Sequence, residues 1–176
     1  MPGQAGSHAR AYDIRSMPLP RRRPAHFVSH PAFLRPGFGR HHPLSTGRQA
    51  AVVELVRVLG WVGDDGIHEA PLPSIDDLAR FHDRRYLAAL ERAGSSVLAT
   101  ADDRVRFNLG TMECPVFEGL WERARASVGG SILAATLAMR DGGVGYHPAG
   151  GTHHGRREKA SGFCYLNDPV FAILHV

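Results

Sequence analysis

The sequence predicts an α/β fold with parallel strands, on three observations. Short apolar runs typical of strands stand at 25–29 and 144–147, and the residues between them show apolar positions at three- and four-residue steps. A long loop after the second run leads into another apolar helix at 168. Strands that alternate with helices favour a parallel sheet. Only two or three strands can be counted, fewer than an ordinary sheet contains, which indicates part of a larger domain.

Composition and charge exclude several classes of protein. Of the 176 residues 43% are hydrophobic, enough for one core, and no run of 18 apolar residues predicts a membrane span. Residues 1–24 hold five of the 21 basic residues and one of the 17 acidic ones, so the rest of the chain is neutral and lacks the basic face of a nucleic-acid-binding protein. Cys114 and Cys164 are expected to be reduced thiols in a cytoplasmic protein.

The segment 1–24 is expected to be a disordered basic extension. It is rich in Pro, Gly and Arg, and it lacks the apolar stretch of a signal peptide. Met17 is an alternative start of the protein.

The first half of the chain gives the following expected elements. After the first strand, prolines and glycines predict a loop over 30–46. Apolar residues at helical spacing predict a helix over 47–59. Ser74 is a plausible N-cap of a short helix. A further helical pattern covers 86–94, and residues 94–107 are expected to be irregular.

The second half is dominated by one long helix, expected over 115–139 with a proline in its first turn. Gly129 and Gly130 inside it cost about 1 kcal/mol each relative to alanine, which indicates close packing against another element. In the last helix Asp168 is the expected N-cap and Pro169 the first helical residue.

The loop 148–168 carries the candidate chemistry, the adjacent His153 and His154. It follows a strand, and ligands of parallel sheets bind at the carboxyl ends of strands. Imidazoles titrate near neutrality, so the pair suits proton transfer in a hydrolysis, although two histidines could also be plain surface residues. A zinc site needs three or four ligands, and no set of ligands at recognisable spacing accompanies the pair.

Several motifs resemble the histone deacetylase family, most closely its bacterial, acetoin-utilisation-type members. The most specific are AGGTHH at 149–154 and ASGFCYLND at 160–168, in this order and at the family's spacing. Weaker matches are NLGTMECPVF at 108–117 with Gly119-Leu120, His42-Pro43-Leu44 with Arg48, and LARFH at 78–82 with Tyr86. The resemblance covers about residues 26–176.

The resemblance implies an arginase/deacetylase-like three-layer α/β fold with a parallel sheet, of which residues 25–176 form the N-terminal half. It implies zinc-dependent deacetylation of acetyl-lysine, in a protein or peptide, or of a similar small acetylated amine. The family's zinc ligands, and the tyrosine that stabilises its oxyanion, would follow Val176. We therefore expect zinc in the complete protein, and neither a catalytic zinc nor activity in this truncated chain alone.

The resemblance also assigns the catalytic roles. His154 corresponds to the main general base, and His153 corresponds to its electrostatic and proton-transfer partner.

Four further residues are assigned to the substrate and the product in the same way. Gly162 and Phe163 correspond to positions that line the channel for the lysine stem. Gly151 is a substrate-binding candidate on other grounds, because the adjacent glycines before the histidines allow a ligand to approach the backbone closely. Glu113 corresponds to an acidic rim residue that holds substrate backbone amides, and the family commonly has aspartate there. Arg48 corresponds to an arginine of a channel linked to acetate release.

Other interpretations stay open at this stage. Phe163 could belong to the core, and Glu113 could stabilise the start of the expected helix at 115. The chain could be a non-catalytic remnant that acts as a binding module. It could also be a metal-binding protein that uses His41 and His42 with the later histidine pair. The true substrate and the oligomeric state are not predicted.

Overall fold

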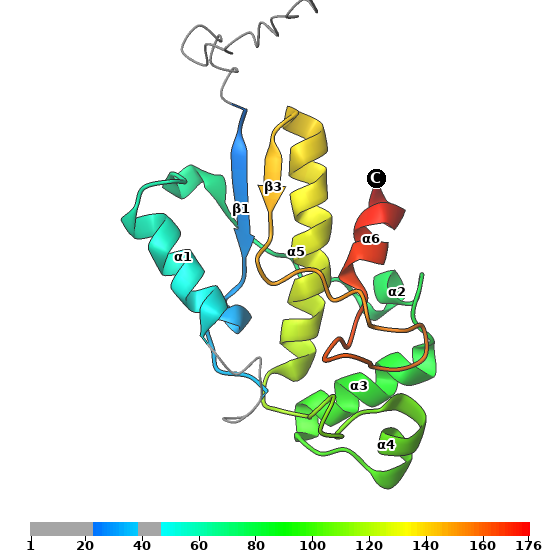
Figure 1. The fold of residues 1–176 in the computed structure, drawn as a ribbon. Coiled ribbons are helices and arrows are strands. Elements are labelled where there is room, and N and C mark those ends of the chain that lie inside the picture. Colours follow the sequence, from blue (N-terminus) through cyan, green and yellow to red (C-terminus); the bar gives the residue numbers. More distant parts are fainter. Residues whose placement is uncertain (1–22, 39–46) are drawn as a thin grey trace, which may run out of the picture.

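The computed structural model describes residues 23–38 and 47–176, so nearly all of the expected extension, and His41 and His42, lie outside the described residues. The elements in chain order are β1 (Ala25–Ser29), the 3-10 turn η2 (Pro31–Phe33), α1 (Arg48–Val58), the 3-10 turn η3 (Asp64–Gly66), β2 (Ile67–Glu69), α2 (Ile75–Leu78), α3 (Arg84–Ser96), α4 (Ala101–Phe107), α5 (Leu120–Asp141), β3 (Val144–Tyr146) and α6 (Asp168–His175) (Figure 1).

The described strands form one parallel sheet in the order β2-β1-β3. Phe27 of the central strand pairs with Ile67 of β2 on one side and with Tyr146 of β3 on the other. The sequence did not predict β2, because Ile67–Glu69 is too short, and too polar at His68 and Glu69, to show the alternation of a strand.

Helices cover both faces of the sheet, as the expected three-layer architecture requires (Figure 1). Successive side chains of a strand point to opposite faces. Phe27 accordingly packs against Val53 of α1, and Val28 packs against Ala134 and Leu137 of α5.

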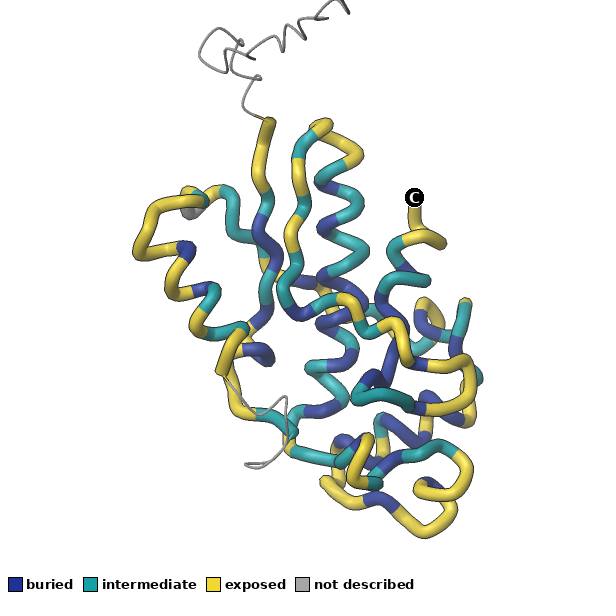
Figure 2. Tube along the Cα trace, in the orientation of Figure 1, coloured by how far each residue is buried: buried dark blue, intermediate teal, exposed yellow. Residues whose placement is uncertain are grey.

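The largest core lies beside the sheet, among α2, α3, α5 and α6 (Figure 2). Tyr86, Leu87 and Leu90 of α3 are completely buried there, next to Leu166 and Phe171. Leu166 belongs to the loop that follows β3 and also lines the candidate site, so the packing of this core supports one wall of that site.

The glycine pair of α5 allows the close packing that the sequence predicted. A Cβ at Gly129 would lie 1.8 Å from the carbonyl oxygen of Pro71, and one at Gly130 would lie 2.4 Å from the ring of His147. No side chain fits at such distances, so α5 lies directly against the loop before α2 and the residue that follows β3.

Two expectations for the middle of the chain were wrong. Residues 101–107 are helical, because the side chains and backbones of Thr100 and Asp103 form a reciprocal capping box. The long helix begins at Leu120 and not at 115. Gly119 takes a left-handed conformation with φ of 77°, and the carbonyl of Pro115 accepts a hydrogen bond from the hydroxyl of Tyr165.

A buried histidine fixes the end of the loop that follows β3. The backbone N–H of Asn167 donates to Nε2 of His82 over 3.1 Å, so Nδ1 carries the hydrogen and donates to the carbonyl of Arg157 over 3.3 Å. Burial lowers the pKa of His82 to about 4, which keeps this tautomer neutral. Asn167 also caps α6 by accepting from the N–H of Val170, so the expected cap at Asp168 was one residue too late.

We expect the protein to lose stability in acid through His82. In the unfolded state His82 regains its ordinary pKa of 6.5, so as the pH falls the unfolded protein binds a proton before the native protein does. The native state therefore loses stability from about pH 6.5 downward, and this loss is complete below about pH 4. The pKa difference corresponds to about 3 kcal/mol in the free energy of unfolding. Urea unfolding between pH 7.5 and pH 4 measures it. His82→Gln should flatten this dependence, and an equally steep loss in that variant would contradict the assignment.

Candidate active site

A cavity of about 490 Å³ lies where the loop after β3 meets the beginnings of α1 and α5. Five of the residues singled out in the sequence line it: Arg48, Gly151, His154, Gly162 and Phe163. His153 and Glu113 are not among the lining residues, but each contacts one that is. The structure therefore brings all seven predicted site residues to one place.

The two histidines lie ring to ring, with centroids 4.1 Å apart. Both side chains are exposed, and His154 faces the cavity. Nδ1 of His153 lies 2.9 Å from the carbonyl oxygen of Gly151. Because a carbonyl only accepts, Nδ1 carries the hydrogen and Nε2 is the basic nitrogen of the neutral ring. The pair can therefore hold and move protons at the edge of the cavity.

Gly162 allows His154 to take its position. A Cβ at Gly162 would lie 2.8 Å from Cβ and Cγ of His154, and the backbone there is left-handed with φ of 54°. Any side chain at this position would displace the imidazole of His154 and would strain the backbone.

The buried carboxylate of Asp168 holds the beginning of the histidine loop. It accepts hydrogen bonds from the backbone N–H of Gly151 over 3.0 Å and of Thr152 over 2.6 Å. The hydroxyls of Thr152 and Ser131 also contact it. Asp168 is 1% exposed, so these contacts replace its water. The sequence had suggested a helix cap only, and this anchoring role was missed.

Glu113 braces the turn at Gly162. Its Oε1 accepts from the backbone N–H of Gly162 over 2.6 Å, and its Oε2 accepts from Nδ2 of Asn108 over 2.8 Å. These hydrogen bonds hold the pKa of Glu113 below its ordinary value. The alternative of a charge in the first turn of α5 is wrong, because that helix begins only at Leu120.

Phe163 and Arg48 form walls of the cavity. Phe163 is half-buried and lies outside the core clusters, so the interpretation as a core residue is not supported. Arg48 is the first residue of α1 and is exposed. Sequence reasoning missed Phe38 and Arg123, which also line the cavity, because they reach it from segments far away in the chain.

Both cysteines are buried and free, as expected. Burial raises the pKa of Cys114 to about 12 and also raises the pKa of Cys164, so both thiols stay protonated at neutral pH.

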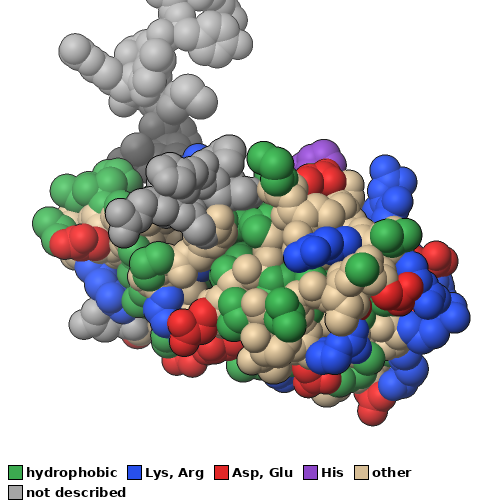
Figure 3. All heavy atoms as spheres, turned by 90° about the horizontal axis from the view of Figure 1, so that it is seen from below, with side chains coloured by type: hydrophobic (Ala, Val, Ile, Leu, Met, Phe, Trp, Pro, Cys, Tyr) green, Lys and Arg blue, Asp and Glu red, His purple; other side chains and the backbone are tan. Residues whose placement is uncertain are grey.

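Among residues 23–38 and 47–176, no group of three or more His, Cys, Asp or Glu side chains could hold a metal ion, so these residues do not by themselves fit a zinc site. Nor does any helix there have the length and apolarity to cross a membrane. On the face seen from below, basic and acidic side chains are interspersed (Figure 3).

Comparison with known proteins agrees with the motifs. The model of the histone deacetylase domain matches residues 42–176. The acetoin utilization protein AcuC of Bacillus subtilis is 34% identical over 153 residues, which are 85% of this chain and 39% of that protein. Histone deacetylase 1 of Homo sapiens is 31% identical over 141 residues, 79% of this chain and 29% of the human protein.

Solved structures show the same fold. An HDAC homologue from Aquifex aeolicus superposes with a TM-score of 0.78 at 23% identity, over 85% of this chain and 40% of that one, and so does an HDAC homologue complexed with SAHA. The chain therefore spans about two fifths or less of the length of the relatives it matches. The domain match, the motifs and the shared fold together place the chain in the histone deacetylase family.

Proposed function

We propose that the protein is a zinc-dependent deacetylase and that this chain supplies the proton-transfer and substrate side of its site. The observation that carries the proposal is the anchored pair His153–His154 at the edge of a 490 Å³ cavity. Membership in the family supports deacetylation. Zinc enters through the family resemblance alone, because the described residues offer no set of three ligands.

Hydrolysis of an acetylated amine needs two proton transfers. Water must lose a proton as its oxygen attacks the acetyl carbon, and the amine nitrogen must gain one as the C–N bond breaks. His154 faces the cavity and is the proposed base. His153 is its proton-transfer partner, with Nε2 as its basic nitrogen. The products are the free amine and acetate.

The cavity wall suits an acetylated lysine. Phe38, Phe117, Phe163 and Tyr165 line it, and such aromatic faces pack well on an apolar methylene stem. The exposed carboxylate of Glu113 lies beside the wall and can accept from substrate backbone amides. We therefore propose acetyl-lysine in a peptide as the preferred substrate, with a small acetylated amine as the alternative.

A second candidate is a non-catalytic binding module. It is favoured by the aromatic lining of the cavity, which can bind a side chain without any proton transfer. In this case the cavity would bind an acetylated side chain without turning it over.

The two free, protonated thiols support a cytoplasmic location for either function.

Replacement of His154 by alanine in the complete protein should lower turnover of an acetyl-lysine peptide by about 10²–10⁴-fold, the usual contribution of a general base. Arg156→Ala is the matched control, since Arg156 is exposed in the same loop and does not line the cavity. Zinc content and melting temperature should match wild type in both variants. Near-normal turnover by the zinc-loaded His154 variant would remove this residue from the mechanism.

Glu113→Gln separates charge from structure at the rim. The amide oxygen can still accept from Gly162, while the hydrogen bond from Asn108 and the negative charge that attracts substrate amides are both lost. We expect kcat/KM to fall about tenfold or more for an acetylated peptide and little for a small acetylated amine. Glu118→Gln, an exposed glutamate outside the cavity, should change neither. Equal losses on both substrates would show that Glu113 only supports the loop.

A further inference from the structure

Two histidines outside the candidate active site face each other on neighbouring strands. His26 of β1 and His68 of β2 stand on the side of the sheet that α5 covers, because Val28, which pairs with His68 and lies two residues after His26, packs against α5. Nδ1 of His26 lies 3.0 Å from Nε2 of His68, and the ring centroids are 5.1 Å apart. The pair lies near the end of α5, before β3 begins, whereas the cavity lies beyond the end of β3 (Figure 1).

A carboxylate fixes the ring of His26. This side chain is 10% exposed, and its buried Nε2 lies 3.1 Å from Oδ2 of Asp141, the last residue of α5. The hydrogen bonds from Arg140 hold the pKa of Asp141 below its ordinary value, so the carboxyl is ionised at neutral pH. Because a carboxylate only accepts, Nε2 of the neutral His26 ring carries the hydrogen. The lone pair is therefore on Nδ1, the nitrogen that faces His68.

This is the arrangement of a metal-binding histidine. A ligating imidazole commonly donates its second N–H to a carboxylate, which orients the ring and makes the ligating nitrogen more basic. Metal–nitrogen bonds of about 2.0–2.1 Å place two ligating nitrogens about 2.9 Å apart at a right angle and about 3.3 Å apart at the tetrahedral angle. The 3.0 Å between His26 and His68 is within this range. The two strands thus already hold both nitrogens at the separation that one ion needs.

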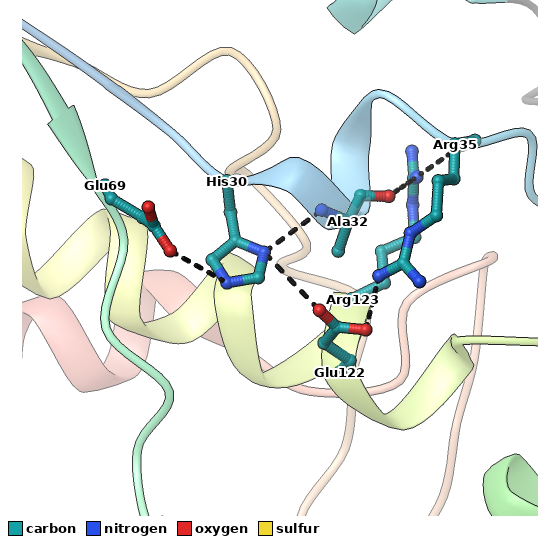
Figure 4. Close-up of polar contacts among 6 residues, drawn as sticks. All are labelled: His30, Ala32, Arg35, Glu69, Glu122 and Arg123. Atoms are coloured by element: carbon teal, nitrogen blue, oxygen red, sulfur yellow. Dashed lines mark hydrogen bonds and ion pairs between the residues drawn. The ribbon is translucent and has the colours of Figure 1, made fainter.

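The neighbouring acid does not provide a third ligand. Glu69 is the next residue of β2 after His68, and its Oε1 lies 3.7 Å from Nε2 of His30 instead (Figure 4). His68 is only half-buried, so water can reach the other positions around an ion. Imidazole nitrogens with water suit Ni²⁺ and Cu²⁺, whereas Mg²⁺ prefers carboxylate and carbonyl oxygens.

We propose that His26 and His68 bind a divalent transition-metal ion of the nickel and copper kind, with Asp141 as the carboxylate that orients His26. Without metal, Nε2 of His68 carries the hydrogen between the rings and donates it to His26. With metal, His68 carries this hydrogen on Nδ1, so binding changes the tautomer and releases no net proton. The ion joins β2, which has three residues, to β1 and through Asp141 to α5. It therefore stabilises the native sheet.

Nickel binding to the complete protein tests the site without any turnover. Calorimetric titration gives the number of bound Ni²⁺ ions and their affinity, and Ni²⁺ is the probe because Cu²⁺ displaces zinc more readily. Zinc content before and after shows any exchange at another site. Wild type should bind one more equivalent of Ni²⁺ than His68→Gln, and Ni²⁺ but not Mg²⁺ should raise the melting temperature of wild type above that of the variant. Neither histidine lines the active-site cavity, so a failure of the proposed deacetylation leaves this result unchanged.

A second variant tests the carboxylate. Asp141→Asn should weaken the affinity for Ni²⁺ about 10- to 100-fold, the usual effect of losing the partner of a ligating histidine. Asp102→Asn is the matched control and should leave the affinity unchanged, since Asp102 also pairs with an arginine of its own helix but lies on α4. If His68→Gln does not fold, Asp141→Asn decides. Equal Ni²⁺ stoichiometry in wild type and His68→Gln, an unchanged affinity in Asp141→Asn, or equal stabilisation of wild type by Mg²⁺ would overturn the proposal.

Discussion

A buried carboxylate at the start of α6, that of Asp168, joins the two ends of the loop that carries the candidate site. It accepts from the amides of Gly151 and Thr152 at the beginning of the loop, while Asp168 itself follows its end. A buried charge is unfavourable unless it is hydrogen-bonded, so the native structure keeps these donors in place. The contact with Ser131 ties the same carboxylate to α5. Because His153 and His154 come two and three residues after Gly151, the hydrogen bonds to Asp168 also fix where these histidines lie.

A second set of contacts holds the loop from its other side. The side-chain amide of Asn167 donates to the carbonyls of His153 over 3.1 Å and of Gly155 over 2.9 Å. The backbone of Asn167 in turn is fixed on the buried, neutral His82. The backbone around the histidine pair is thus fixed by polar contacts that do not involve a metal. Groups held in this way lose little freedom when substrate binds, which favours catalysis.

Much of this arrangement could be predicted from the sequence, because local pattern carries it. The strand at 25–29, the helices around α1 and α3, and the close packing at Gly129 and Gly130 follow from periodicity and composition. The histidine loop was recognisable because its motifs are contiguous.

The rest depends on long-range contacts that no local pattern reveals. The three residues of β2 form a strand only because β1 lies beside them. The start of α5 shifts to Leu120 because Tyr165, fifty residues after Pro115, bonds to its carbonyl. Arg123 of α5 reaches the cavity beside Gln49 of α1 and donates to the carbonyl of Ala32, although these residues lie far apart in the chain. The role of Asp168 was hidden because a carboxylate before a proline also fits a helix cap.

Hydrogen exchange of the loop in an Asp168→Asn variant tests the central claim most directly. Asparagine keeps the shape of the side chain but removes the charge that the two amides and two hydroxyls bind. If this carboxylate holds the loop, the amides of Gly151 and Thr152 should exchange about tenfold faster or more, while those in the core of α3 keep their protection. Unchanged exchange at Gly151 and Thr152 would show that the loop is held by other contacts and would contradict the account.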